Sequence, residues 1–204
     1  MTNLVTIERE YGSGASAIAH RVAEKLGWEL WDQRLTDEIA RRMSCDRRHV
    51  EQQEERKDPL HYRLFKSFLR GSFEGSLNAP RLRLADAAGI RQMTEQLIRD
   101  IAAKGNAVIV GRGSAYYLCD RPHAFHVFVY APFGEKVHRI QSEGKSEAEA
   151  TDLVHTVDQE RTEFIKEHFE IDWPTRQYFH LMVNSTIGEE AAAEMIIHGR
   201  NTIA

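Results

Sequence analysis

The stretch LVTIEREYGSGASAIAHRVAEKLG, residues 4–27, decides the fold, because an apolar run, a glycine loop and an amphipathic segment follow one another in it. Residues 4–7 are rich in β-branched side chains, which predicts a short strand. Gly12 and Gly14 then interrupt the chain. Beyond them the apolar residues recur at three- and four-residue spacing and form one helix face: Ile18, Ala19, Val22, Ala23 and Leu26. Gly27 stands where a helix commonly ends in a left-handed residue, so the stretch predicts a strand, a loop and a helix in succession.

Strand and helix patterns alternate along the rest of the chain. Further strands are expected at residues 28–31, 107–110, 125–130 and 181–183. Further helices are expected at residues 33–43, 83–103 and 147–167, in a segment through Val137 and Ile140, and in a last segment ending near residue 197. This alternation predicts the α/β class, with a central parallel sheet of about five strands between helices on both sides. The chain, residues 1–204, reads as a single domain, and its stretch 42–90 reads as a helical insertion without a strand pattern.

Composition and charge narrow the classes of function. Of the 204 residues, 42% are hydrophobic and 28% are charged, which is typical of a soluble globular protein. The 27 basic and 31 acidic residues leave a net charge of −4, which argues against bulk binding to nucleic acid or to an anionic membrane. No apolar run approaches the roughly 20 residues that span a bilayer. Small anionic ligands are still compatible with this charge, because a local basic pocket is enough for them.

The cysteines and the N-terminus bear on the compartment. Cys45 and Cys119 are the only cysteines and are far apart, so neither a disulfide scaffold nor a zinc ribbon is expected. The chain reaches Glu8 and Glu10 before a signal-type apolar core could form. We therefore expect a cytoplasmic protein in a reducing compartment.

The glycine loop between the first strand and the first helix is a candidate anion site. Such a loop exposes backbone N–H groups and the positive end of the helix dipole. Ser16 could place a hydroxyl on Mg²⁺, as the Ser or Thr of a phosphate-binding loop does. Aligned with the pattern G-x-x-x-x-G-K-[ST], the loop has Arg9 at the first glycine and Ala15 at the lysine. The alternative is an ordinary strand-to-helix turn that contains glycines.

An ordered set of motifs resembles the cytidylate kinase-like family, a branch of the P-loop nucleoside monophosphate kinases. The motifs are IEREYGSG at 7–14, LWD at 30–32, VIVGRG at 108–113, VFVYAP at 127–132, DQER at 158–161, DW at 172–173 and NST at 184–186. The resemblance runs in order from Leu4 to about Ile197. It implies a three-layer P-loop kinase fold in which ATP, with Mg²⁺, donates a phosphoryl group to a nucleoside monophosphate, CMP or dCMP. It also implies that residues 42–90 form the acceptor-side insertion and that residues from about 136 to 170 form the lid.

The resemblance assigns the glycine loop to ATP. The implied phosphate-binding residues are Gly12, Ser13, Gly14, Ala15 and Ser16, and Ser16 would also bind the metal. Asn184 ends the last strand near where the adenine should lie, although it also suits the cap of the final helix. Because Ala15 stands at the lysine position, Arg9 is the nearest cation for the terminal phosphates, with the lid arginines behind it.

Residues that follow other strands are implied in acceptor binding. Arg112 resembles the arginine that grips the acceptor phosphate, and its planar guanidinium suits bidentate contact; the alternative is a surface arginine in a tight turn. Asp32 stands where the family places an acceptor-side acid, and it could also cap the next helix. Arg34 is a further candidate, although the family's arginine tends to stand directly after the aspartate, where this chain has Gln33.

The lid contributes the remaining candidates. Arg139 and Arg161 would close over the transferring phosphates, and Asp158 would contact the acceptor. Lys136 and Arg139 share one helix face, as do Asp158 and Arg161. The alternative is two solvated pairs on the helix surface.

Two departures from the family pattern leave a second function open. Ala15 replaces the loop lysine, and Val110 and Gly113 replace the acids that flank the acceptor arginine in ordinary cytidylate kinases. The alternative is a nucleotide-binding regulatory or structural protein that kept the fold and lost catalysis. Residues 59–83 are both basic and apolar, which fits either a flap over an anionic acceptor or a subunit contact in a homodimer.

Overall fold

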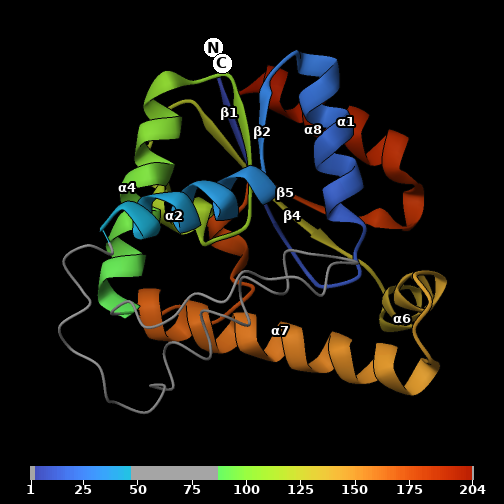
Figure 1. The fold of residues 1–204 in the computed structure, drawn as a ribbon. Helices are drawn as coiled ribbons and strands as arrows, with labels where there is room; N and C mark the ends of the chain where they lie inside the picture. The colour runs from blue at the N-terminus through green and yellow to red at the C-terminus, as the bar shows by residue number, and fades with distance from the viewer. Residues whose placement is uncertain (1–2, 47–86, 204) are drawn as a thin grey trace, which may run out of the picture.

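A five-stranded parallel sheet forms the centre of the molecule. The computed structural model describes residues 3–46 and 87–203. The strands are β1 (Leu4–Arg9), β2 (Glu29–Trp31), β3 (Ala107–Val110), β4 (Ala124–Tyr130) and β5 (Leu181–Asn184), in the order β2-β3-β1-β4-β5 (Figure 1). All neighbouring strands are parallel, so the predicted α/β class and parallel sheet are confirmed.

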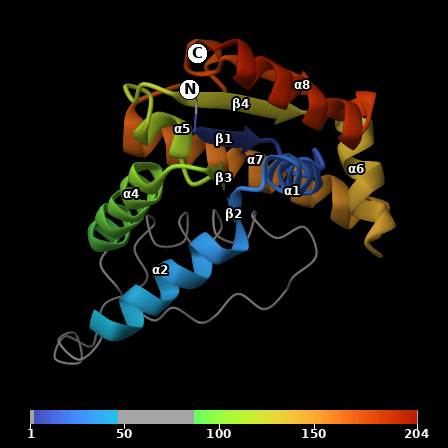
Figure 2. The ribbon, with the colours of Figure 1, turned by 90° about the horizontal axis from the view of Figure 1, so that it is seen from above.

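Helices cover both faces of the sheet. On one face lie α1 (Ala15–Leu26) and α8 (Glu189–Thr202), and on the other lie α2 (Gln33–Asp46), α4 (Ala87–Lys104) and the short α5 (Ser114–Tyr117). Figure 2 shows α1 and α4 on opposite sides of the strands. Two further helices, α6 (Phe133–Ser142) and α7 (Glu147–Phe169), pack together, and α7 crosses the end at which the strands finish (Figure 1).

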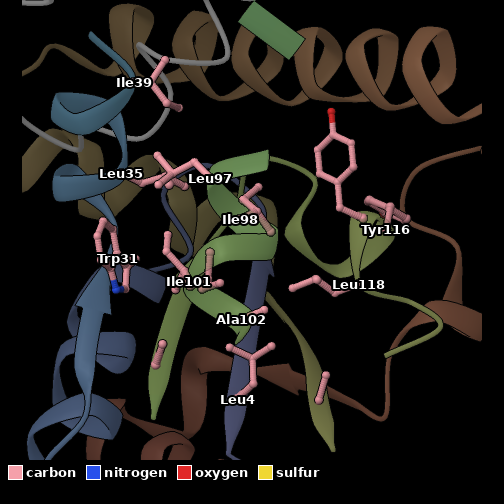
Figure 3. Close-up of a cluster of buried hydrophobic side chains, with 14 of the residues drawn as sticks. Leu4, Trp31, Leu35, Ile39, Leu97, Ile98, Ile101, Ala102, Tyr116 and Leu118 are labelled. Atoms are coloured by element: carbon pink, nitrogen blue, oxygen red, sulfur yellow. The ribbon is translucent and has the colours of Figure 1, made fainter. Parts of the chain in front are cut away.

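The alternation of side chains along β1 explains why apolar residues at its start point to both faces of the sheet. Val5 and Ile7 belong to the core beneath α1 and α8, whereas Leu4 belongs to the core beneath α2 and α4. Figure 3 shows this second core, to which Leu35 of α2, Ile98 of α4 and Leu4 belong. A parallel strand buried on both faces has no solvent side, and a continuous apolar run is its usual sequence.

The boundaries of the described helices and strands lie close to those that the sequence pattern predicts. The helix expected at 83–103 is described from Ala87 to Lys104, and Ser146 and Glu149 form a capping box at the start of α7. The helix α5 was not predicted, because four residues are too few for an apolar period to be recognised. Most of the insertion expected at 42–90, including the segment 59–83, lies outside the described residues. Over residues 3–46 and 87–203, no helix is both long and apolar enough to cross a membrane.

His126, on β4, makes the stability of the fold sensitive to pH. Its Nε2 donates to the Leu118 carbonyl at 3.2 Å, so its Nδ1 accepts from the Thr6 hydroxyl at 2.7 Å and the ring is neutral. Burial, followed by the charge of His180, lowers the pKa of His126 from 6.5 to about 4 in the folded state. Its stabilising contribution is complete above pH 6.5 and is lost as the pH falls towards 4.

The free energy of unfolding is therefore expected to fall by about 3 kcal/mol between pH 6.5 and pH 4 through this residue. Urea unfolding across that range measures it. A His126→Gln variant keeps a donor and an acceptor and should show a flatter dependence, whereas the exposed His138→Gln control should follow the parent chain. An unchanged slope in His126→Gln would show that other groups carry the effect.

Candidate active site

The loop between β1 and α1 is held in shape by two left-handed glycines. Gly12 has φ +72° and Gly14, at the N-cap of α1, has φ +73°. Helix α6 lies directly on the loop, because a Cβ placed on Gly12 would come within 2.9 Å of the Lys136 carbonyl oxygen. A side chain at position 12 would therefore separate the loop from α6.

The amides of this loop suit an anion. The first N–H groups of α1, from Ala15 to Ala17, have no acceptor within their own helix. Within the part of the chain that the structure describes, the N–H groups of Gly12 and Gly14 also donate to no acceptor, and the buried Ser13 hydroxyl has no hydrogen-bond partner. These unused donors, at the positive end of α1, fit a phosphate group.

Ser16 and Asp32 form a pair beside the loop. The Ser16 hydroxyl donates to Asp32 Oδ2 at 2.8 Å, and the other carboxylate oxygen, Oδ1, is buried without a partner among the described residues. Asp32 follows β2 and accepts from Ser16 rather than from the first amides of α2. A hydroxyl and a carboxylate oxygen fit Mg²⁺, which in nucleotide sites takes its other ligands from phosphates and water. Consistent with this, residues 3–46 and 87–203 contain no cluster of three or more His, Cys, Asp or Glu side chains that could hold a metal by itself.

Three arginines are buried beneath the loop. Arg9, Arg112 and Arg161 are 5%, 0% and 4% exposed. Arg161 Nη1 donates to the Arg9 carbonyl at 2.8 Å, and the Arg9 guanidinium lies against Gly111. Helix α7 is thereby tied to the end of β1.

Arg112 is not a surface residue, so the surface-turn alternative is excluded for it. Its guanidinium donates to the Thr36 hydroxyl of α2. Burial, together with the positive charge of Arg9, lowers the pKa of Arg112 to about 9, and the carboxylate of Asp32 opposes this shift.

A buried carboxylate accompanies these arginines. Glu8 is 3% exposed, and its Oε1 accepts from the Ser114 hydroxyl at 3.3 Å. Burial raises the pKa of Glu8, while the charges of Arg9 and Arg161 oppose that shift. Ser114 directly follows Gly113, one of the two positions near the end of β3 at which an acid was expected from the resemblance and is missing. Glu8 of β1 therefore places a carboxylate next to this position.

Helix α7 contacts the loop through one carboxylate. Asp158 Oδ1 accepts the Tyr11 N–H at 2.7 Å and lies 3.4 Å from Arg161 Nη1, and Asp158 Oδ2 accepts from Lys136 Nζ at 2.9 Å. Lys136 Nζ also lies 3.0 Å from Glu10 Oε2. Burial alone would lower the pKa of Lys136, but Asp158 and then Glu10 outweigh it, so this pKa is raised. Lys136 and Arg161 are buried and Asp158 and Arg139 are half-buried at the loop, which excludes the alternative of solvated pairs on the helix surface.

Arg139 connects the loop with the end of β5. Its Nη1 donates to the Gly12 carbonyl at 3.2 Å and to the Ser185 hydroxyl at 3.0 Å. Asn184 caps the short 3₁₀ turn Ser185–Ile187 by accepting from the Thr186 N–H at 3.1 Å, rather than capping the final helix.

One predicted residue lies apart from this cluster. The Arg34 side chain is 57% exposed, pairs with Glu29 at 3.4 Å and lies over the ring of Trp31. The other predicted residues surround the loop or line the strand ends next to it. Four contributing residues were not predicted as site residues: Glu8, Glu10, Lys136 and Ser185. Glu8 alone carried a local signal, as an acid following an apolar strand.

The sheet order and the glycine loop after β1 define a P-loop kinase fold. Residues 4–187 match the cytidylate kinase-like family, so the chain belongs to that family, and the expectation drawn from the motifs is confirmed. Membership supports phosphoryl transfer from a nucleotide in general terms.

Two solved structures support the fold. An uncharacterized protein from Eubacterium ventriosum ATCC 27560 is similar over 98% of each chain, with 21% sequence identity and a TM-score of 0.69. A shikimate kinase from Bacteroides thetaiotaomicron is similar over 95% of this chain and 96% of that one, with 15% identity and a TM-score of 0.53. No curated protein matches the chain.

Proposed function

We propose that this protein is an ATP-dependent kinase that transfers a phosphoryl group to a nucleoside monophosphate, with CMP or dCMP as the acceptor. One observation carries the proposal: the loop with the unused amides of Gly12 and Gly14 leads directly into Ser16, which pairs with Asp32, and buried arginines lie at the neighbouring strand ends. Amides for phosphates, oxygens for a metal and guanidiniums for transferring charge are the parts that phosphoryl transfer needs.

The residues divide into two sides. On the donor side, residues 12–16 would hold the ATP phosphates, Arg139 would neutralise charge beside Gly12, and Asn184 would lie near the adenine. Ser16 and Asp32 would hold Mg²⁺, which supplies charge stabilisation when bound. Further acceptor-side roles are proposed for Asp158 and, less centrally, for the exposed Arg34.

Positioning and charge are the main contributions of such a site, because little covalent chemistry is left to the protein in phosphoryl transfer. Arg9, Arg112 and Arg161 lie at the carboxyl ends of the strands under the loop, where they would meet the acceptor phosphate and the transferring group. Their burial excludes water, and electrostatic interactions are stronger in such an environment than in water.

A coupled assay of ADP release tests the proposal over CMP, dCMP, UMP, AMP, GMP and shikimate. We expect turnover with CMP or dCMP well above the rate of ATP hydrolysis without acceptor. ATP binding without turnover on any acceptor would instead favour the alternative, a nucleotide-binding protein without catalysis. The presence of Ala15 at the lysine position of the loop favours that alternative. A preference for shikimate would keep the kinase and change the acceptor.

An Arg112→Met variant tests the acceptor side separately. Methionine fills much of the same space without a charge, so the affinity for the acceptor monophosphate should fall by a factor of about 30 to 100, as expected for a lost guanidinium–phosphate contact. The KM for ATP should change little. Titration of both substrates measures the effect, and an unchanged acceptor KM in a folded variant would remove Arg112 from the acceptor site.

A further inference from the structure

The loop lacks a cation of its own for the terminal phosphates. Its lysine position holds Ala15, which is buried in the core beneath α1. A cation must therefore come from another element if ATP is to be used, because developing charge on the phosphates has to be balanced.

Helix α6 brings a lysine against the start of this loop. Its backbone at Lys136 touches the loop, as the 2.9 Å approach to a Cβ at Gly12 shows, and the Lys136 side chain is only 9% exposed. The ammonium ends 3.0 Å from a carboxylate oxygen of Glu10, which belongs to the loop itself.

The Lys136 ammonium and the Tyr11 backbone amide both contact the carboxylate of Asp158. Lys136 Nζ lies 2.9 Å from Asp158 Oδ2, and the Tyr11 N–H lies 2.7 Å from Asp158 Oδ1. A backbone amide and a lysine thus contact the two oxygens of one carboxylate. Phosphate groups are bound by the same combination of donors.

We propose that Lys136 replaces the missing loop lysine and contacts the terminal phosphates of ATP. This inference rests on the proposed function, since it names a further residue of the same site.

Lys136 suits this role better than the arginines around the loop. Arg9 lies against Gly111 beneath the loop, and Arg161 is committed to the Arg9 carbonyl. Arg139 is committed to the Gly12 carbonyl and the Ser185 hydroxyl. Both hydrogen-bond partners of Lys136 are carboxylates, so the ammonium already binds anionic oxygens of the kind that a phosphate presents. The flexible stem of lysine lets its point charge move to follow such a ligand.

Lys136→Gln and Lys136→Arg variants test the proposal by titration with ATP and with ADP. Loss of the charge in Lys136→Gln should weaken ATP binding about tenfold or more and ADP binding less, because the terminal phosphate loses its partner. Lys136→Arg should stay within about threefold of the parent chain, since the charge is kept. Lys166→Gln, on an exposed side chain of α7, is the matched control and should bind both nucleotides normally.

The titrations distinguish a failure of this inference from a failure of the proposed function. If the parent chain binds no ATP, the proposed function fails. If it binds ATP and a folded Lys136→Gln variant binds ATP equally well, or loses ATP and ADP affinity to the same extent, Lys136 is not the terminal-phosphate cation. Thermal unfolding checks folding, and Lys136→Met, which preserves the packing of the apolar stem, repeats the comparison if the glutamine variant is unfolded.

Discussion

Gly12→Ala is expected to weaken ATP binding about 100-fold and to lower turnover at least as much, because the loop has no room for a β-carbon. The added Cβ would lie 2.9 Å from the carbonyl oxygen of Lys136, which is fixed in helix α6. The backbone there has φ +72°, a conformation that costs an L-residue roughly 1–2 kcal/mol. Either the loop or α6 must move, and in both cases the amides and Lys136 no longer converge.

Gly27→Ala separates the two causes. Gly27 has nearly the same left-handed conformation, φ +65°, but a Cβ there meets nothing within 4 Å. This control should lose stability without losing ATP affinity. Isothermal titration with ATP and thermal unfolding of both variants measure the difference. Normal ATP binding by Gly12→Ala would show that the contact between the loop and α6 is not needed for the site.

The fold was predictable because its signals are local. Each central strand is an apolar run of a few residues, and the helices that follow have regular apolar faces, as at Ile18 and Val22. The strand order was not readable from periodicity. It depends on which apolar faces meet, as in the pairing of Ile7 with Val110 across more than a hundred residues.

The site was predictable only in part. Ser16 and Asp32 lie beside glycine and strand-end signals, and the resemblance placed both of them in the site. Lys136 and Glu8 were not predicted, because their roles come from tertiary contacts: Lys136 meets Glu10, which is 126 positions away, and Glu8 meets Ser114. A charged residue on a helix is normally solvated, and only the approach of α6 to the loop makes Lys136 an exception.

Arg34 was predicted as a site residue because it stands two positions after Asp32, and closeness in sequence is a weak guide to the position of a side chain. Successive residues of a helix point about 100° apart, so the position two after Asp32 does not share its direction. In the structure Asp32 accepts from Ser16 at the loop, whereas Arg34 pairs with Glu29 at the edge of the sheet. Its part in acceptor binding stays a proposal.

Asp32→Asn is expected to lower turnover by a factor of about 100 or more and to weaken the dependence on Mg²⁺, because it removes the carboxylate proposed for the metal. Asparagine keeps an acceptor oxygen for the Ser16 hydroxyl, so the contact at 2.8 Å can persist and the fold should be preserved. The lost negative charge should change the affinity for ATP in opposite directions with and without Mg²⁺. ATP should bind more weakly than to the parent chain when Mg²⁺ is present, and equally or more tightly when the metal is chelated, since a negative charge beside the phosphates has gone.

ATP titrations with Mg²⁺ and with excess EDTA measure both arms of this experiment. Asp37→Asn, on the exposed side of α2, is the matched control, because it removes the same charge at a carboxylate that accepts from Gln33. That control should follow the parent chain in both titrations. Equal ATP affinities of Asp32→Asn and the parent chain in the presence of Mg²⁺ would mean that Asp32 does not hold the metal. A loss of ATP affinity that persists in EDTA would mean that Asp32 shapes the loop through Ser16, and the carboxylate would then be a structural partner of the phosphate site rather than a metal ligand.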